Sequence, residues 1–279
     1  MQPNYSEVLS RHGFTFSKAK GQNFIINPGV CPRMAALCGA TKADGVLEIG
    51  PGAGALTRAL SDVAGKVAAV ELDARLLPVL EETLADLDNV AVVQGDILQI
   101  DLPALLKEQF GGMPVHVCAN LPYYITSPIL MHLLESRLPF ISITVMAQKE
   151  AAQRLCAPMG TRACGAVTAA VAYYAEARQL FSVSRGSFFP APNVDSAVLQ
   201  LGLRPEPPVQ VPDEAFFFRV IRAAFNQRRK TAANAISAGL SLDKSLVLQA
   251  MARAGIPIES RAENLSLEAY AKLAKELSL

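Results

Sequence analysis

The sequence contains few of the residues that build metal centres, disulfides or catalytic dyads. Its five cysteines include no CxxC pair, and their number is odd, so neither a disulfide framework nor a zinc site is expected. Its three histidines are scattered along the chain without the spacing of metal ligands or of a catalytic triad. We therefore expect no metal, and ordinary buried thiols in a reducing compartment.

The sequence also lacks a long apolar run. The first 20 residues carry no apolar core of the kind found in signal peptides. The longest stretch without an acidic or basic residue runs from Gln109 to Leu134, and three prolines and Asn120 interrupt it. Such a stretch is typical of a strand, a loop and a helix rather than of a membrane span. We expect a soluble, cytoplasmic protein with no membrane partner.

Charge is sparse and nearly balanced. Charged residues make up 18% of the chain, the net charge is +1, and hydrophobic residues make up 51%. A packed core is therefore expected, and the overall charge does not indicate a nucleic-acid partner. Local basic clusters occur at Lys18 with Lys20 and at Arg228 to Lys230. A run of three basic residues is more often a solvated helix face than an RNA contact, so it needs other support.

Short β-rich runs alternate with helical segments from about residue 45. The expected strands cover 45–50, 66–73, 89–96, 115–124 and 140–148, and the expected helices cover 55–64, 74–87, 128–136 and 149–157. This alternation predicts an α/β fold with a doubly wound parallel sheet. Two later segments, 178–184 and 195–204, are typical of an antiparallel pair at the edge of the sheet.

A proline-rich linker ends this pattern. Four prolines lie between Arg204 and Glu214. Every periodic segment beyond it is helical, over 216–225, 228–237, 246–255 and 266–279. We therefore expect one domain over 1–204 and a small all-α domain over 205–279.

A glycine-rich turn follows the first strand of the alternating region. Gly50, Gly52 and Gly54 lie between that strand and the next helix, where glycines let the backbone turn tightly and approach a ligand. The spacing is GxGxG rather than the GxGxxG of dinucleotide sites, which favours a cofactor without a pyrophosphate. Glu48, just before the turn, can hold it by accepting backbone N–H bonds.

Two carboxylates end the next two strands. Glu71 is placed to accept hydrogen bonds from both hydroxyls of a ribose, with Asp73 as the alternative. Asp96 can accept from an adenine amino group. Ligands of open α/β sheets bind beyond the carboxyl ends of the strands, so these groups predict a nucleotide-like cofactor. The competing interpretation is a glycine-rich turn with two surface acids.

The fourth strand runs into Asn120-Leu121-Pro122-Tyr123. Adenine N6 is a poor nucleophile because its lone pair is delocalised into the ring. Its attack on a sulfonium methyl group needs two acceptors for the N–H bonds more than it needs a base. The Asn120 side-chain oxygen and the Leu121 carbonyl can be these acceptors. Pro122 stiffens the loop, and Tyr123 can stack on an extruded base. The competing interpretation is a structural Asn-Pro turn with a packed tyrosine.

These motifs resemble the ribosomal RNA adenine N6,N6-dimethyltransferase family, whose bacterial members modify two adjacent adenosines near the 3′ end of small-subunit (16S) rRNA. The resemblance is carried by KAKGQNFI, EIGPGAGALT, ELD, GD, NLPYYITSPI, VMAQKEAAQR, SFFPAPNVDSAV, FNQRRKT and RAENL. It implies a Rossmann-like S-adenosylmethionine methyltransferase domain followed by a helical RNA-binding domain. It also implies S-adenosylhomocysteine as the product, no metal, and a role in ribosome biogenesis. The implied partners are small-subunit rRNA and the immature 30S subunit. The sequence leaves the oligomeric state open, and we expect a monomer.

The resemblance further implies roles for single residues. Gln22, Asn23 and Ile25 would cap the cofactor site, and the cofactor contacts would be Gly50, Gly52, Glu71, Asp96 and Asn120. Asn120 with Tyr123 would hold the target base. Phe188 would stack on its other face, although the adjacent Phe189 leaves open which ring does so. The RNA backbone would be contacted by Lys149, Arg154, Arg228, Arg229 and Lys230.

Three other functions compete with this one. Large-subunit rRNA adenine N6-methyltransferases usually carry NIPY and lack RRKT, so NLPY and FNQRRKT favour the small-subunit enzyme. A non-catalytic ribosome assembly factor would be expected to lose the acceptors around N6, which are intact here. An NAD-dependent oxidoreductase is disfavoured by the GxGxG spacing and by the lack of any histidine near the strand ends except His116.

Overall fold

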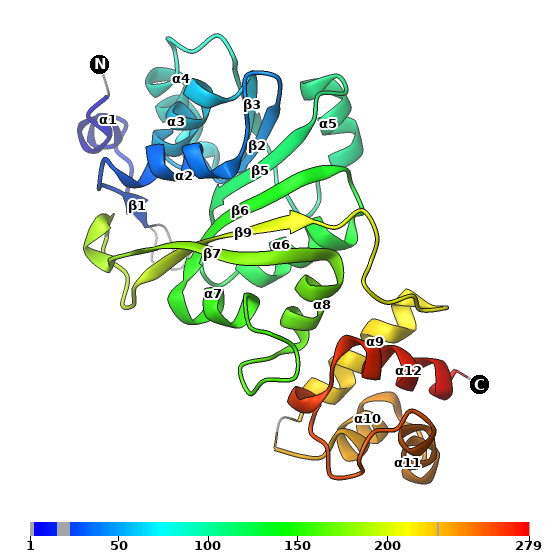
Figure 1. The fold of residues 1–279 in the computed structure, drawn as a ribbon. Helices are drawn as coiled ribbons and strands as arrows, with labels where there is room; N and C mark the ends of the chain where they lie inside the picture. The colour runs from blue at the N-terminus through cyan, green and yellow to red at the C-terminus, as the bar shows by residue number, and fades with distance from the viewer. Residues whose placement is uncertain (1–2, 16–22, 228, 279) are drawn as a thin grey trace. The chain divides into compact units, whose positions relative to one another are not determined.

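The computed structural model of the chain describes residues 3–15, 23–227 and 229–278. Its contacts divide into two compact units (Figure 1). The first unit joins Met1–Ala152 to Arg178–Leu203, and the second joins Gln153–Ala177 to Arg204–Leu279. The second unit starts its main segment where the domain boundary was expected, but it also takes in 153–177. The division therefore differs from the continuous domain of 1–204 that the sequence suggested.

A seven-stranded sheet forms the framework of the first unit. Its strands are β2 (Gly45–Ile49), β3 (Lys66–Glu71), β4 (Val90–Gln94), β5 (Val115–Asn120), β6 (Phe140–Gln148), β7 (Ala175–Val183) and β9 (Ser196–Leu203). They lie in the order β4-β3-β2-β5-β6-β9-β7. The pairs among β2 to β6 are parallel, whereas β9 runs antiparallel to β6. The predicted doubly wound α/β class is confirmed.

The central strands are buried along nearly their whole length because both faces of the sheet are covered. All five residues of β2 are buried, and so are all residues of β3 after Lys66. The strand order reverses at β2, with β3 on one side of it and β5 on the other. A reversal of this kind opens a crevice beyond the carboxyl ends of the two central strands.

Helices pack on both faces of this sheet. Those of the first unit are α1 (Tyr5–Arg11), α2 (Val30–Cys38), α3 (Ala55–Val63), α4 (Leu77–Thr83), α5 (Leu102–Phe110) and α6 (Thr126–Glu135), while α7 (Lys149–Leu155) crosses into the second unit. Met34 of α2 and Leu60 of α3 are fully buried in one apolar cluster with Cys118 of β5. Right-handed crossovers place α3 and α6 on opposite faces, because β2-α3-β3 and β5-α6-β6 progress in opposite directions. Figure 1 shows α6 behind the sheet.

A second, two-stranded sheet ties the N-terminal region to a distant segment. Strand β1 (Phe24–Ile25) pairs antiparallel with β8 (Phe188–Phe189), so that Phe24 lies opposite Phe189 and Ile25 opposite Phe188. This pairing brings Phe24 and Ile25 to the edge of the crevice.

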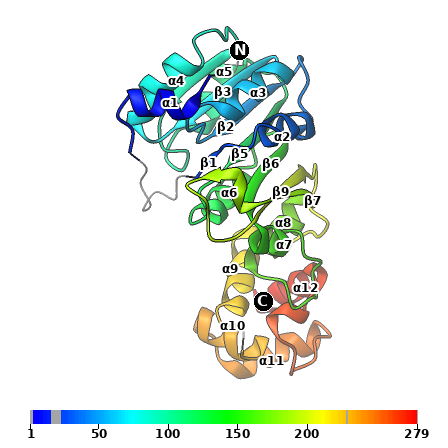
Figure 2. The same cartoon turned by 90° about the vertical axis from the view of Figure 1, so that its left-hand side faces the viewer.

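The second unit is helical. Its helices are α8 (Ala166–Tyr174), α9 (Glu214–Phe225), α10 (Ala232–Leu240), α11 (Lys244–Arg253) and α12 (Leu267–Leu277), of which the last four are grouped in Figure 2. Tyr173 and Tyr174 of α8 donate hydrogen bonds of 3.1 and 2.6 Å to Glu214 of α9. The Tyr174 ring stacks on Phe218 at 5.4 Å between centroids. These contacts explain why 153–177 groups with the C-terminal helices.

Arg229 and Lys230 of the basic cluster lie in a turn before α10. The sequence predicted a helix from residue 228, but α10 begins at Ala232, because the Thr231 side chain caps it by accepting from the Asn234 N–H at 3.5 Å. Arg229 and Lys230 precede the helix and are exposed. Within the described ranges, no helix combines the length and the apolar character needed to cross a membrane.

Candidate functional site

A cavity lies beyond the carboxyl ends of β2, β3, β4 and β5. Its volume is about 400 Å³, which falls in the range of about 300–1,000 Å³ that is usual for small-molecule sites. Its polar lining includes Asn23, Glu48, Glu71, Asp73, Asp96 and Asn120. Apolar walls are added by Leu9, Ile25, Leu72, Ile97, Leu121 and Phe189. The predicted cofactor residues that the structure describes therefore meet at one place.

The glycine-rich turn forms one wall of the cavity. Gly50, Gly52 and Gly54 have φ angles of 69°, 62° and 93°, in the left-handed region that favours glycine. A Cβ on Gly52 would lie 3.1 Å from the Phe24 ring, and one on Gly54 would lie 3.0 Å from the Leu84 side chain. The turn is thus fixed both by its backbone conformation and by close neighbours.

Glu71 connects this turn to the end of β3. Its Oε2 accepts from the Gly52 N–H at 3.2 Å, and its Oε1 accepts from the Asp73 N–H at 2.8 Å. Burial raises the pKa of Glu71, and these backbone hydrogen bonds oppose the rise. Each carboxylate oxygen can accept more than one hydrogen bond, so Glu71 keeps capacity for a ligand. The Asp73 carboxylate is engaged by the Arg75 guanidinium, at 2.6 and 2.9 Å.

Asp96 is held in place at the end of β4. Its Oδ1 accepts from the Leu98 N–H and its Oδ2 from Gln99 Nε2, both at 3.0 Å. Leu72 also lines the cavity, although 59% of it is exposed. Leu72 and Asp96 therefore give this part of the cavity an apolar surface next to a polar one.

Asn120 lines the same cavity as Gly50. Its Nδ2 donates to the Asn23 carbonyl at 3.3 Å, which leaves Oδ1 as an acceptor. The next residues form a closed turn into α6, because the Pro122 carbonyl accepts from Ile125 N and from Thr126 Oγ1, both at 3.1 Å. The amide of Asn120 is therefore anchored through its nitrogen, on a loop that is itself fixed.

Tyr123 and one of the two adjacent phenylalanines add aromatic surface to the cavity. The Tyr123 hydroxyl lies 2.6 Å from Ser196 Oγ, and burial raises the pKa of this tyrosine. Phe189 is 55% exposed and lines the cavity, whereas Phe188 is 2% exposed and packs in the apolar cluster of α2 and α3. Consecutive strand residues point to opposite faces, so β8 can present only one of the two rings. The sequence left open whether Phe188 or Phe189 stacks on the target base; the burial of the two rings favours Phe189, and the stacking role stays a prediction.

Glu48 does not hold the glycine-rich turn. It is 1% exposed, and neither carboxyl oxygen has a hydrogen-bond partner among the described residues. The turn is held instead by Glu71 through the Gly52 N–H, and by the Gly50 N–H donating to the Val70 carbonyl at 2.9 Å. Glu48 lines the cavity, and its burial raises its pKa to about 8.

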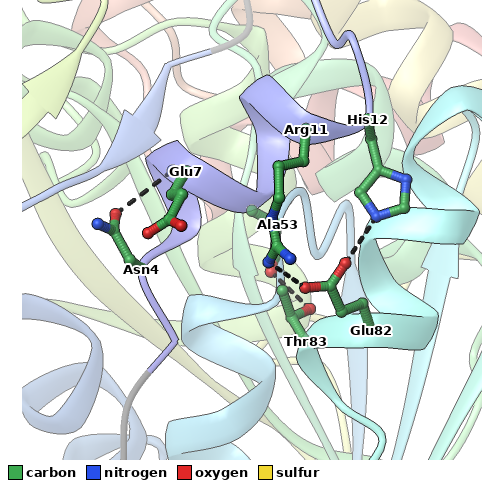
Figure 3. Close-up of polar contacts among 7 residues, drawn as sticks. All are labelled: Asn4, Glu7, Arg11, His12, Ala53, Glu82 and Thr83. Atoms are coloured by element: carbon green, nitrogen blue, oxygen red, sulfur yellow. Dashed lines mark hydrogen bonds and ion pairs between the residues drawn. The ribbon is translucent and has the colours of Figure 1, made fainter.

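Helix α1 covers part of the cavity and is fastened to α4 (Figure 3). Arg11 pairs with Glu82, and His12 Nε2 lies 2.8 Å from the same carboxylate. Thr83, the next residue of α4, donates to the Ala53 carbonyl of the glycine-rich turn at 3.0 Å. Tyr5, Ser6 and Leu9 of α1 line the cavity. These contacts connect α1, through α4, to the glycine-rich turn that forms one wall of the cavity.

The predicted RNA contacts are all exposed where the structure describes them. Lys149 lies in the first unit, and Arg154, Arg229 and Lys230 lie in the second. Gln22 and Arg228 fall outside the described residues. The RNA-binding role of these residues stays a prediction.

Sequence reasoning missed several residues of the cavity. The α1 residues escaped because a seven-residue helix is too short to give a periodic signal. Leu72 escaped because an apolar residue at a strand end looks like core. Its position between Glu71 and Asp73 was the available signal. Among the described residues no group of three or more His, Cys, Asp or Glu is arranged to hold a metal ion.

Comparison with known proteins agrees with this geometry. A family model described as ribosomal RNA adenine dimethylase matches residues 13–279. The chain is 46% identical to ribosomal RNA small subunit methyltransferase A of Shouchella clausii, over 97% of this chain and 92% of that protein. It is likewise 46% identical to the protein of that name from Bacillus licheniformis, over 97% of this chain and 94% of that one.

Two solved structures resemble the fold over most of the chain. A dimethyladenosine transferase from Plasmodium falciparum has a TM-score of 0.74 and 25% identity, over 90% of this chain and 95% of that one. The 23S rRNA methyltransferase ErmE has a TM-score of 0.67 and 26% identity, over 92% of this chain and 100% of that one. The family model covers nearly the whole chain, and both relatives are 46% identical to it over almost its full length. The chain belongs to the ribosomal RNA adenine dimethylase family.

Proposed function

We propose that this chain transfers methyl groups from S-adenosylmethionine to the N6 amines of two adjacent adenosines near the 3′ end of small-subunit (16S) rRNA. One observation carries the proposal. The Asn120 amide is anchored through its nitrogen and keeps its oxygen as an acceptor, in the cavity that the glycine-rich turn also lines. The names of the relatives at 46% identity support the small subunit as the target.

The residues of the cavity fit S-adenosylmethionine. Glu71 has acceptor capacity for the ribose hydroxyls, and Asp96 is fixed where it can accept from the adenine amino group. Leu72 and Ile97 give the purine ring an apolar surface. Asn23, Ile25 and the backbone of Gly50 and Gly52 would enclose the remaining part. When bound, the cofactor supplies an electrophilic methyl group on a sulfonium.

The residues of the β5 loop prepare the amine that attacks. Asn120 Oδ1 and the Leu121 carbonyl accept the two N–H bonds of N6, and this draws the nitrogen lone pair out of conjugation with the ring. Pro122 holds the loop so that both oxygens are oriented before the base arrives. No general base is required, because the N–H bonds acidify as the new bond forms.

Aromatic rings hold the target base after it leaves its helix. Tyr123 provides one ring, with its hydroxyl fixed by Ser196 at 2.6 Å. Phe189 provides the other from β8. Stacking of a base on an aromatic ring is worth about 1–3 kcal/mol, which offsets part of the cost of extruding the nucleotide.

Basic residues outside the cavity would contact the RNA backbone. Lys149, Arg154, Arg229 and Lys230 are exposed and suited to phosphate contacts, and Arg228 would extend the last pair. We infer that the partner is the immature 30S subunit, that the chain acts as a monomer, and that it works in the cytoplasm, where such subunits assemble.

Methyl transfer to isolated subunits tests the proposal. Under-methylated 30S subunits are incubated with the protein and S-adenosylmethionine, and the rRNA is digested and analysed by mass spectrometry. We expect N6,N6-dimethyladenosine at two adjacent positions near the 3′ end of 16S rRNA and none in 23S rRNA treated in parallel. Modification of 23S rRNA alone would assign the chain to the large subunit. Binding to 30S subunits without any methyl transfer would make it an assembly factor.

A further inference from the structure

Glu48 is a buried carboxyl group that the proposed chemistry does not use. It is the fourth residue of β2, it is 1% exposed, and it lines the cavity. Neither of its oxygens has a hydrogen-bond partner among the described residues. A buried carboxylate without hydrogen-bond donors is strongly disfavoured. The protonation state of Glu48 should therefore depend on the charge of the ligand that enters the cavity.

The groups that face Glu48 offer it no positive charge. They are Tyr5 of α1, Cys31 of α2, Thr57 of α3, Glu71 of β3 and Cys118 of β5. Burial raises the pKa of both thiols and of the tyrosine, so all three are neutral near pH 7. The nearby Thr57 hydroxyl opposes part of the rise in the pKa of Glu48. The two side chains do not meet the geometry of a hydrogen bond. Burial and the nearby Glu71 carboxylate raise that pKa to about 8.

We propose that Glu48 carries a proton when no cation occupies the cavity and releases it when the cationic end of S-adenosylmethionine enters, so that the site recognises the positive charge of its ligand. The inference rests on the proposed function, since it names the same ligand. It makes Glu48 a specificity-determining residue rather than a part of the turn.

The step balances in charge and atoms. The neutral carboxyl group loses its O–H proton to solvent and becomes a carboxylate, which then faces the ammonium and sulfonium of the ligand. The buried negative charge and the ligand's positive charge compensate each other, so that neither is left unpaired at low dielectric. A ligand with the same adenosine part and no charge leaves Glu48 protonated.

Proton release on binding is the direct test. Titration calorimetry is run at pH 6.5 in phosphate and in imidazole, two buffers of different ionisation enthalpy, with S-adenosylmethionine and with the uncharged nucleoside 5′-methylthioadenosine. Because a group with a pKa of about 8 is almost fully protonated at this pH, we expect close to one proton released per S-adenosylmethionine. We expect none for 5′-methylthioadenosine. Equal release for both ligands, or none for either, would overturn the proposal.

The pH dependence of affinity gives a second reading. For the wild-type protein, affinity for S-adenosylmethionine should rise roughly tenfold from pH 6.0 to pH 7.0. This window lies below the usual pKa of an α-amino group, about 7.7–8.0, so the ligand's own titration contributes little. In Glu48→Gln the affinity should be lower, the pH dependence flat and the proton release lost. Glu81→Gln, which changes an exposed carboxylate on α4, should behave like the wild type.

The outcomes separate this inference from the proposed function. A protein that dimethylates 30S subunits but binds S-adenosylmethionine without proton release refutes the role of Glu48 alone. A protein that binds neither ligand refutes the proposed function. If Glu48→Gln does not fold, as judged by circular dichroism, the comparison of the two ligands on the wild-type protein still decides the question.

Discussion

The two adjacent phenylalanines of β8 allow the base-binding assignment to be tested by a pair of substitutions. Phe188 is 2% exposed within the cluster of α2 and α3, whereas Phe189 is 55% exposed at the cavity. The two side chains are chemically identical and differ only in the face of the strand that they occupy. Replacing each by alanine therefore separates a packing effect from a binding effect.

The expected magnitudes follow from these positions. Phe188→Ala removes a fully buried ring and should lower the free energy of unfolding by about 3–5 kcal/mol. Phe189→Ala removes a half-exposed ring and should lower it by less than about 1 kcal/mol. If Phe189 stacks on the target base, its loss should remove about 1–3 kcal/mol of stacking. That corresponds to roughly a 5- to 150-fold decrease in kcat/KM for the RNA substrate.

Urea unfolding and methyl transfer to 30S subunits measure the two effects. Phe188→Leu serves as the control that preserves most of the buried volume, and it should retain activity close to the wild-type value. Full activity in Phe189→Ala, together with a large loss in a well-folded Phe188→Leu, would show that the buried ring turns outward to bind the base. The assignment to Phe189 would then be wrong.

Three further predictions concern the cofactor and the RNA. Glu48→Gln should stabilise the protein in the absence of ligand. The pKa of the Glu48 carboxyl group is about 8 in the folded protein and near 4.3 in the unfolded chain. Between these pH values the folded state binds one proton more than the unfolded state, so the free energy of unfolding of the wild type falls as the pH rises from about 4 to about 8. The gain should reach about 4 kcal/mol at pH 8 and be much smaller at pH 5; equal gains in urea unfolding at the two pH values would rule out a protonated Glu48. Glu71→Ala should weaken S-adenosylmethionine binding by about 1–3 kcal/mol in titration calorimetry, and unchanged affinity would move the ribose contact to Asp73. Replacing Arg229 and Lys230 by glutamine should weaken rRNA binding and reduce the slope of log affinity against log salt by about 1.5; an unaltered slope would make the pair a solvated turn.

The sheet was predictable from the sequence, because its central strands are short, mostly apolar runs that alternate with helical segments. The glycine-rich turn and Glu71 were predictable for a related reason, since strand ends in a parallel sheet converge on one edge. The order of strands at the far edge, with β9 between β6 and β7, depends on long-range pairing that no local pattern encodes.

The points that the sequence left open or misassigned have specific physical causes. Which of Phe188 and Phe189 faces the cavity is set by the register of β8 against β1, and a shift of one residue would exchange them. Glu48 looked like a turn-holding residue because the sequence does not reveal that Glu71, 23 positions later, takes the Gly52 N–H. The start of the helix after the basic cluster was misplaced because the Thr231 cap, not the apolar period, sets where α10 begins.

The role of Asn120 is the central claim, and substitution of this one side chain tests it most directly. Asn120→Ala removes the acceptor but leaves the basic residues and the glycine-rich turn in place, so the fold and the binding of 30S subunits should change little. Mass spectrometry of 16S rRNA from treated 30S subunits should then show that N6,N6-dimethyladenosine formation is abolished, with a rate at least 10²-fold below the wild type. Dimethylation at a wild-type rate by this variant would contradict the account.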